Sequence, residues 1–140
     1  MTVCVSGGFD PPHSGHAAYI EAASKFGDVV IILNSDEWLK KKKGYIFMPW
    51  DQRASVVGLW KGVTDVIPVD DRDGTVCDAL RKLRPFAFCK GGDRTAENTP
   101  EVELCGHLGI ELIWNCGGKK VASSSEIVER IREPILKDSM

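Results

Sequence analysis

The sequence predicts an α/β fold: a single domain with a Rossmann-like, doubly wound, mostly parallel sheet of five strands. Two observations carry this prediction. Five short apolar runs, rich in β-branched or aromatic residues, recur along the chain, as expected of strands covered on both faces. Segments with helical periodicity lie between them, so strand and helix alternate about five times. Ligands of such sheets bind beyond the carboxyl ends of the strands, where the strand order switches.

Length and composition limit what this fold can serve. A chain of 140 residues, 43% of them hydrophobic, is expected to form one domain over residues 1–140. The formal charge of -2 gives no electrostatic reason to expect nucleic acid or a membrane as partner. No apolar run approaches the roughly 20 residues that span a bilayer, and no secretory signal opens the chain, so we expect a cytoplasmic protein. The five cysteines include no Cys-x-x-Cys pair and are expected to be reduced and buried.

The five strands are expected where apolar residues run continuously. They are Thr2–Gly7, Asp28–Asn34, Asp65–Val69, Phe86–Cys89 and Ile110–Trp114.

Helices are indicated between these strands. One apolar helical face follows the first strand and consists of Tyr19, Ala22, Ala23 and Phe26. Another precedes the fourth strand and consists of Val76, Ala79, Leu80 and Leu83. We expect Asp73 to cap this second helix and Pro85 to stop it. The next helix should begin at Thr99 and Pro100 and end at Gly109. A last helix is expected from Ser123, which has capping-box spacing to Glu126.

The segment "GGFDPPHSGH" (residues 7–16) joins the first strand to the first helix. Gly8 permits close approach of a ligand to the backbone, and N–H groups at a helix start favour an anion such as phosphate. His13 and His16 are three residues apart and can both face that anion, as imidazolium or as neutral donors. No Walker A loop or complete dinucleotide fingerprint is present. The segment therefore predicts a site for a nucleoside triphosphate. Metal ligation and an ordinary pair of surface histidines are the alternatives, although no third metal ligand stands at a suggestive spacing.

The same segment resembles the signature of the H-x-G-H nucleotidyltransferases, the cytidylyltransferase-like superfamily. Four further segments resemble enzymes of that superfamily that act on heptose 1-phosphate or glycerol 3-phosphate, and they follow in the same order. They are "NSDEWLKKKKG" (34–44), "DQR" (51–53), "FCKGGDR" (88–94) and "SSSEIVERI" (123–131). The resemblance thus covers nearly the whole chain.

The resemblance implies a reaction in which a substrate phosphate attacks the α-phosphate of a nucleoside triphosphate and pyrophosphate leaves. His13 and His16 would then hydrogen-bond the triphosphate as charge develops. Phe9 and Asp10 match residues that line the nucleotide. Mg²⁺ is expected as the counter-ion, held by phosphate oxygens and water rather than by protein ligands.

Basic residues are implied for the phosphates of both substrates. Lys43 matches a lysine that grips them, although any of Lys40 to Lys43 can take that position. Arg53 matches an arginine that reaches the substrate phosphate, and a solvated helix arginine is the alternative. The arginine that glycerol-phosphate enzymes carry before the last helix is absent, and Lys119 or Lys120 is the candidate replacement.

Two segments are expected to face the nucleotide. In "KGGD", Lys90 and Gly91 follow the fourth strand, and Asp93 is placed to accept from ribose or base, unless the segment is a plain turn. Ser123 and Ser124 match the serine-rich entry to the last helix, where hydroxyls and N–H groups meet phosphates; helix capping alone is the alternative.

The sequence leaves the substrates open. ATP and a sugar phosphate such as D-glycero-D-manno-heptose 1-phosphate are favoured, while CTP with glycerol 3-phosphate remains an alternative. A nicotinamide-mononucleotide or pantetheine-phosphate adenylyltransferase, a non-catalytic nucleotide-binding module and a purely structural domain are the others. A homodimer is possible through an apolar region, although core packing explains its rings equally well. The region comprises Trp38, Phe47, Trp50 and Trp60.

Overall fold

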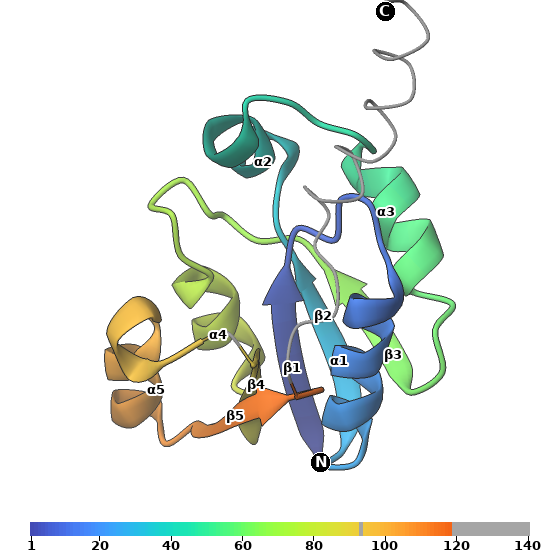
Figure 1. The fold of residues 1–140 in the computed structure, drawn as a ribbon. Helices are drawn as coiled ribbons and strands as arrows, with labels where there is room; N and C mark the ends of the chain where they lie inside the picture. The colour runs from blue at the N-terminus through green and yellow to red at the C-terminus, as the bar shows by residue number, and fades with distance from the viewer. Residues whose placement is uncertain (93, 119–140) are drawn as a thin grey trace, which may run out of the picture.

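A computed structural model describes residues 1–92 and 94–118. The expectations for Asp93, Lys119, Lys120, Ser123, Ser124 and the last helix lie outside these residues. The described chain forms one five-stranded sheet in the order β3-β2-β1-β4-β5, with every strand pair parallel (Figure 1). Its strands are β1 (Thr2–Gly7), β2 (Asp28–Leu33), β3 (Val63–Ile67), β4 (Ala87–Gly91) and β5 (Glu111–Cys116). The predicted doubly wound fold is therefore confirmed, and the sheet is parallel throughout.

The strand order switches at β1. The chain winds outward from β1 through β2 to β3, and then crosses to the other side of β1 to form β4 and β5. Parallel strands need crossover connections, and helices supply them. The carboxyl ends of β1 and β4 therefore mark the place where a ligand site is expected.

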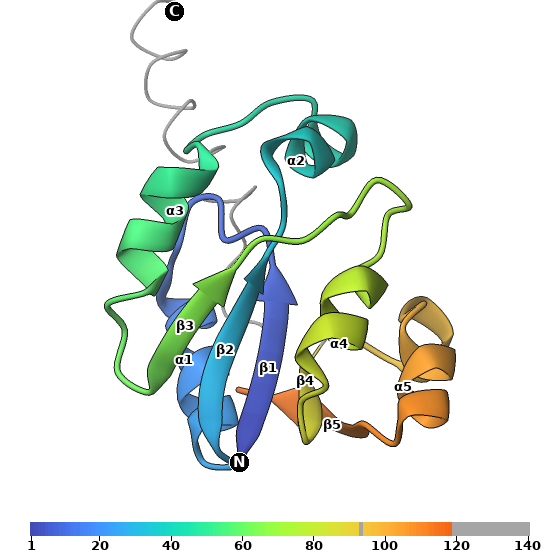
Figure 2. The same cartoon turned by 180° about the vertical axis from the view of Figure 1, so that it is seen from behind.

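Helices cover both faces of the sheet. One face carries α1 (Ser14–Ser24) and α3 (Trp50–Val57), and the other carries α4 (Cys77–Leu83) and α5 (Val102–Leu108), as the opposite views of Figures 1 and 2 show. The short α2 (Asp36–Lys43) follows β2 at the carboxyl edge, and a 3₁₀ turn, η1 (Ala96–Asn98), precedes α5.

Side-chain alternation along the strands explains this double cover. Val3 and Val5 of β1 belong to the core under α1 and α3, whereas Cys4 between them belongs to the core under α4 and α5. In β4, Cys89 and Phe88 divide between the two cores in the same way. Because both faces of such a strand are buried, residues on both faces are apolar, and the strand can be recognised in the sequence as a continuous apolar run.

Some boundaries differ from the expectations. β3 begins two residues before the expected Asp65, and α5 begins at Val102 rather than at Thr99. Asp73 does not cap α4; its carboxylate accepts from the backbone N–H and hydroxyl of Thr75, so the turn before the helix takes it up. Phe26 lies beyond the end of α1 and is exposed. The two predicted helix ends are confirmed. Gly109 is the C-cap of α5, and α4 ends with its C-cap at Arg84, directly before Pro85.

The cysteines are buried, as expected. All five are free thiols inside the protein: Cys4, Cys77, Cys89, Cys105 and Cys116. Within the described residues no helix has both the length and the apolarity needed to cross a bilayer.

Candidate functional site

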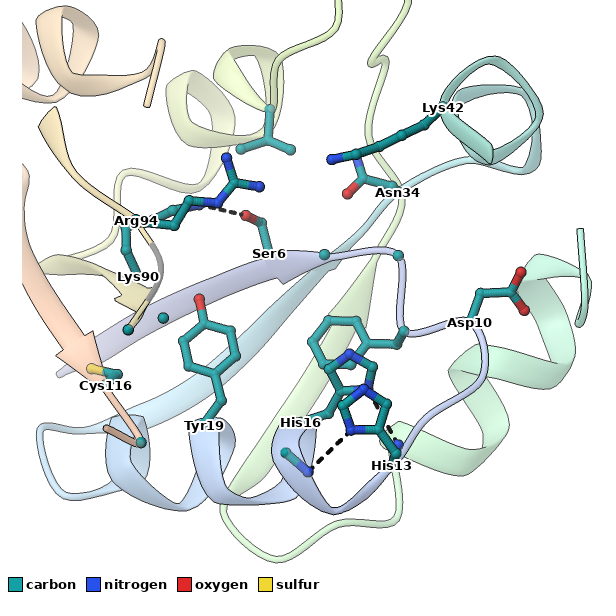
Figure 3. Close-up of a pocket in the computed structure, with 18 of the residues that line it drawn as sticks. Ser6, Asp10, His13, His16, Tyr19, Asn34, Lys42, Lys90, Arg94 and Cys116 are labelled. Atoms are coloured by element: carbon teal, nitrogen blue, oxygen red, sulfur yellow. Dashed lines mark hydrogen bonds between the residues drawn. The ribbon is translucent and has the colours of Figure 1, made fainter. Parts of the chain in front are cut away.

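A cavity of about 390 Å³ opens at the carboxyl ends of β1, β2, β4 and β5, at the switch in strand order (Figure 3). Eight of the residues that the sequence predicted for the site line it together. They are Gly8, Phe9, Asp10, His13, His16, Lys43, Lys90 and Gly91. The structure thus brings Gly8 and Gly91, which are 83 positions apart in the sequence, to one cavity.

The two histidines open helix α1 as a reciprocal cap. His13 is the N-cap residue: its Nδ1 accepts from the backbone N–H of Gly15 at 3.1 Å, and Nδ1 of His16 accepts from the backbone N–H of His13 at 3.2 Å. Their rings stack with centroids 3.7 Å apart. Because both Nδ1 atoms act as acceptors, the ring proton of each neutral imidazole belongs on Nε2. The backbone therefore presets both rings as Nε2–H donors at the wall of the cavity.

Asp10 lines the cavity, but its carboxylate is committed to the backbone. Oδ2 accepts from the N–H of Phe47 at 2.8 Å and Oδ1 from the N–H of Met48 at 2.6 Å. The side chain is 1% exposed and points away from the cavity in Figure 3. Asp10 therefore holds the loop after α2 against the turn after β1, and so shapes the site rather than offering it a free carboxylate.

Two of the four consecutive lysines line the cavity. Lys43 donates from Nζ to the backbone oxygen of Asp10 at 2.6 Å, and burial lowers its pKa below the usual range. Lys42 extends from α2 (Figure 3) and also lines the cavity, with its Nζ 4.6 Å from the centre of the Trp38 ring. Lys40 and Lys41 are exposed and are not among the lining residues. The choice that the sequence left open therefore narrows to Lys42 and Lys43.

Two cations stand on the β4 side. Lys90 is the second-last residue of β4. It is 6% exposed and donates from Nζ to Oγ of Ser6 at 3.3 Å. Arg94, three residues after Gly91, also lines the cavity (Figure 3). Together with Lys42 and Lys43 they give the cavity four cationic side chains. Cationic side chains gathered in this way are suited to phosphate groups.

Glycine packing joins the loops after β4 and β5. A Cβ on Gly92 would lie 2.0 Å from the carbonyl oxygen of Gly118, so no side chain fits there. Gly117 has φ of +82°, and a Cβ on it would lie 3.0 Å from Cα of Tyr19. The second glycine of "KGGD" is thus required by the neighbouring loop, whether or not a ligand approaches it.

Arg53 does not line the cavity. It is 0% exposed, and four hydrogen bonds engage its guanidinium. The acceptors are Oδ1 of Asp36 and the backbone oxygens of Gly8, Asn34 and Met48, at 2.7 to 2.9 Å. The alternative of a solvated helix arginine is wrong. The guanidinium N–H groups are therefore largely used by the protein and leave little for a substrate phosphate. They connect three segments: the turn after β1, the stretch from β2 into α2, and the loop before α3.

Several lining residues were not among those that the sequence predicted for the site. Tyr19 donates from its hydroxyl to the backbone oxygen of Cys89, and burial raises its pKa well above the usual range. Asn34 is held by Asp71, which accepts from its Nδ2 at 3.0 Å. Glu101 is buried, although glutamate at a helix start reads only as a capping signal. Cys116 lies at the end of β5 (Figure 3).

The four aromatic residues that the sequence suggested for a dimer surface lie in three different environments. Trp38 lines the cavity, Trp50 and Trp60 pack against the core under α1 and α3, and Phe47 is 49% exposed. Only Phe47 of these four therefore offers a large exposed apolar ring.

Within residues 1–92 and 94–118, no cluster of three or more histidine, cysteine or acidic side chains is arranged to hold a metal ion.

The fold and the cavity define a class: a parallel, doubly wound domain with histidine donors and cationic side chains at its switch point, an arrangement suited to a phosphorylated ligand. Residues 4–130 match the family profile described as Cytidylyltransferase-like, and the chain belongs to this family. The expectation of a nucleotidyltransferase is thereby confirmed at the level of enzyme class.

Curated relatives and solved structures agree with this assignment. The chain is 33% identical over 135 residues to the bifunctional protein HldE of Campylobacter curvus, covering 94% of this chain and 27% of that protein. It is 32% identical over 141 residues to HldE of Geotalea uraniireducens, covering 97% and 28%. The chain thus spans little more than a quarter of these relatives. A lipopolysaccharide core biosynthesis protein from Thermoplasma volcanium shares the fold, with a TM-score of 0.69, 21% identity and coverage of 87% and 98%.

Proposed function

We propose that this domain transfers the nucleoside monophosphate of ATP to the phosphate of a sugar phosphate, such as D-glycero-D-manno-heptose 1-phosphate, and releases pyrophosphate. One observation carries the proposal. Two stacked histidines, fixed as Nε2–H donors by the backbone, stand in one cavity with Lys42, Lys43, Lys90 and Arg94. Donors held in place before the reaction stabilise negative charge that develops on a transferring phosphoryl group.

The division of the cavity supports two phosphate ligands. The histidines and Lys43 lie near the turn from β1 to α1, whereas Lys90 lies near the end of β4 and Arg94 follows that strand. A triphosphate and an acceptor phosphate brought together between them would be aligned for attack, with repulsion between the two anions offset by the cations. No covalent intermediate with the enzyme is part of this proposal.

The residues present fit a magnesium ion carried by the nucleotide. Of the acidic residues described in the cavity wall, Asp10 has both carboxylate oxygens engaged by backbone N–H groups, which leaves Glu101. Mg²⁺ keeps several waters and is often bound through phosphate oxygens. Its chemistry here would be to neutralise phosphate charge. The protein contributes the histidine and lysine donors.

The choice of ATP and a heptose phosphate rests on the resemblance of the motifs and on the HldE relatives. CTP with glycerol 3-phosphate is the second candidate. The cavity residues contact phosphates by chemistry common to both nucleotides, so the base has to be decided by assay.

Pyrophosphate release with Mg²⁺ tests the proposal directly. ATP and CTP are offered separately against heptose 1-phosphate, glycerol 3-phosphate, nicotinamide mononucleotide and phosphopantetheine. We expect turnover with ATP and heptose 1-phosphate, and its loss in a folded His16→Ala variant. Turnover with another pair would replace the substrates but keep the reaction, whereas nucleotide binding with no turnover of any pair would support a non-catalytic binding module.

A further inference from the structure

Trp38 is a large aromatic residue at the β2 side of the cavity. Among the described residues that line the cavity after β2 and β3, Trp38 alone carries an aromatic ring; the others are Asn34, Leu39, Lys42, Lys43, Gly74 and Val76. Trp50 and Trp60 pack against the core under α1 and α3, whereas Trp38 belongs to neither core of the described residues. It is half-buried, so part of the indole remains uncovered at the cavity wall. A ligand that covers this apolar surface gains free energy from its burial.

The fold fixes the place of this ring. Ser35 caps α2, and its Oγ accepts from the backbone N–H of Trp38 at 3.1 Å. The next residue, Leu39, is fully buried against the turn after β1. A Cβ on Gly8 in that turn would lie 2.7 Å from Cδ2 of Leu39 and 3.5 Å from Cζ3 of Trp38. The edge of the indole therefore lies against the turn that leads to the two histidines.

Lys42 lies one helical turn after Trp38 and adds a charge to the same surface. Its Nζ is 4.6 Å from the centre of the indole ring, which is a cation–π distance, and its side chain extends from α2 (Figure 3). Both residues line the cavity. A phosphate that meets the Lys42 ammonium therefore brings the carbon atoms attached to it close to the indole. The pair can bind the charged group and the apolar part of one small molecule.

The acceptor, rather than the nucleotide, is the substrate expected beside Trp38. In the strand order β3-β2-β1-β4-β5, Trp38 follows β2, whereas Lys90 and Gly91, which we expect to face the nucleotide, belong to β4 on the other side of β1. The histidines follow β1, between these two sides. An acceptor at the β2 side can thus approach a phosphate at the histidines while the rest of the nucleotide lies at the β4 side.

We infer that Trp38 is a specificity-determining residue for the acceptor: its indole packs against the ring of a cyclic sugar phosphate whose phosphate lies near Lys42. The inference rests on the proposed function. One face of a pyranose presents mainly C–H groups, so it is apolar and can pack on an aromatic ring. An acyclic polyol phosphate such as glycerol 3-phosphate has no such face and covers less of the indole. Trp38 therefore favours a cyclic acceptor over an acyclic one that carries the same phosphate.

Substitutions at two positions separate the ring from the charge. Trp38→Leu keeps an apolar side chain with good helix propensity but removes the flat indole, and Trp38→Phe keeps a smaller aromatic ring. Lys42→Gln removes the ammonium and keeps the indole. Trp114→Phe is the matched control, because Trp114 is half-buried in β5 and is not among the described residues that line the cavity. Urea denaturation checks that each variant is folded.

Calorimetric titration measures binding without requiring turnover. α,β-Methylene-ATP, which cannot transfer its nucleoside monophosphate, is titrated first with Mg²⁺. Heptose 1-phosphate, mannose 1-phosphate, glycerol 3-phosphate and inorganic phosphate are then each titrated into the protein saturated with that analogue. We expect Trp38→Leu to weaken both cyclic phosphates roughly 5- to 50-fold, and the other two ligands less than about 3-fold. Trp38→Phe should restore part of the loss, Lys42→Gln should weaken all four ligands by a similar factor, and Trp114→Phe should change none of them.

Four results overturn the inference. The cyclic phosphates keep their affinity in folded Trp38→Leu; all four ligands weaken equally, so that Trp38 acts only through Lys42; the ATP analogue alone weakens, so that the indole packs against the nucleotide; or wild type binds neither cyclic phosphate more tightly than glycerol 3-phosphate. The expected binding pattern without pyrophosphate release from ATP or CTP and any acceptor would instead refute the proposed reaction and leave the role of Trp38 standing, so the two failures are distinguishable.

Discussion

Replacing Arg53 with methionine should destabilise the fold and leave the chemistry of the site intact. The guanidinium is 0% exposed, contacts Asp36 at 2.7 Å and donates to the backbone oxygens of Gly8, Asn34 and Met48. Methionine fills part of the volume but donates nothing, so three carbonyl groups lose a donor. Breaking a buried, hydrogen-bonded charge pair costs about 3–5 kcal/mol. Asp36 is 35% exposed and can be rehydrated, so the three carbonyls carry most of this loss.

Urea denaturation measures the effect. The whole domain is expected to be stable by about 5–15 kcal/mol, so the variant should fold with a much lower midpoint. Arg53→Lys keeps the positive charge but not the planar guanidinium, so its urea midpoint should lie between those of wild type and Arg53→Met. Arg72→Met is the control, because its ion pair with Asp70 lies on the surface and should not shift the midpoint measurably.

A different pattern would refute this reasoning. If Arg53→Met loses less than about 1 kcal/mol of stability but raises KM for the phosphate acceptor, the arginine reaches the substrate, as the sequence resemblance implied. Loss of stability with acceptor KM unchanged in the folded fraction supports the structural role.

Four further predictions concern the cavity. His13→Asn keeps an N-cap acceptor but removes the imidazole, so kcat should fall roughly 10²- to 10³-fold with little change in thermal midpoint. Lys90→Ala should weaken equilibrium ATP binding roughly 10- to 100-fold, because a buried cation is lost. Burial lowers the pKa of Lys43, so its charge is present below that lowered pKa and is lost as pH rises through it; ATP affinity should therefore decline at alkaline pH, and Lys43→Arg should abolish the decline. The Cys89 thiol donates to Cys116 and lowers its pKa, so iodoacetamide should modify Cys116 first, and ATP should slow the reaction.

Each of these has an opposite outcome that counts against it. Full activity of the folded histidine variant would remove the motif from catalysis, and unchanged affinity of the lysine variant would mark "KGGD" as a structural turn. An alkaline decline that persists with arginine at position 43 would assign the titration to another group. Mass spectrometry that finds Cys4 modified before Cys116 would contradict the assigned reactivity, because burial raises the pKa of Cys4.

The sequence by itself determined the strands and the first motif. Continuous apolar runs mark strands buried on both faces. In β1, Val3 and Val5 are buried on one face of the sheet and Cys4 on the other. The histidine motif was equally readable, because its geometry is local: His13 and His16 cap the helix that they begin. Local hydrogen bonds within a few residues leave a signature in spacing, and such features are predictable from one chain.

Only the tertiary structure decided which side chains serve the cavity and which serve the fold. Arg53 and Lys90 are both buried cations, but the guanidinium of Arg53 donates to three backbone oxygens, whereas Lys90 lines the cavity. Asp10 and Glu101 differ similarly, since backbone N–H groups engage both oxygens of the first and one oxygen of the second. The physical reason is that burial and hydrogen-bond partners are supplied by segments distant in sequence. Two residues of the same type therefore look alike in the sequence, and only the packing of the folded chain shows which donors and acceptors each one contacts.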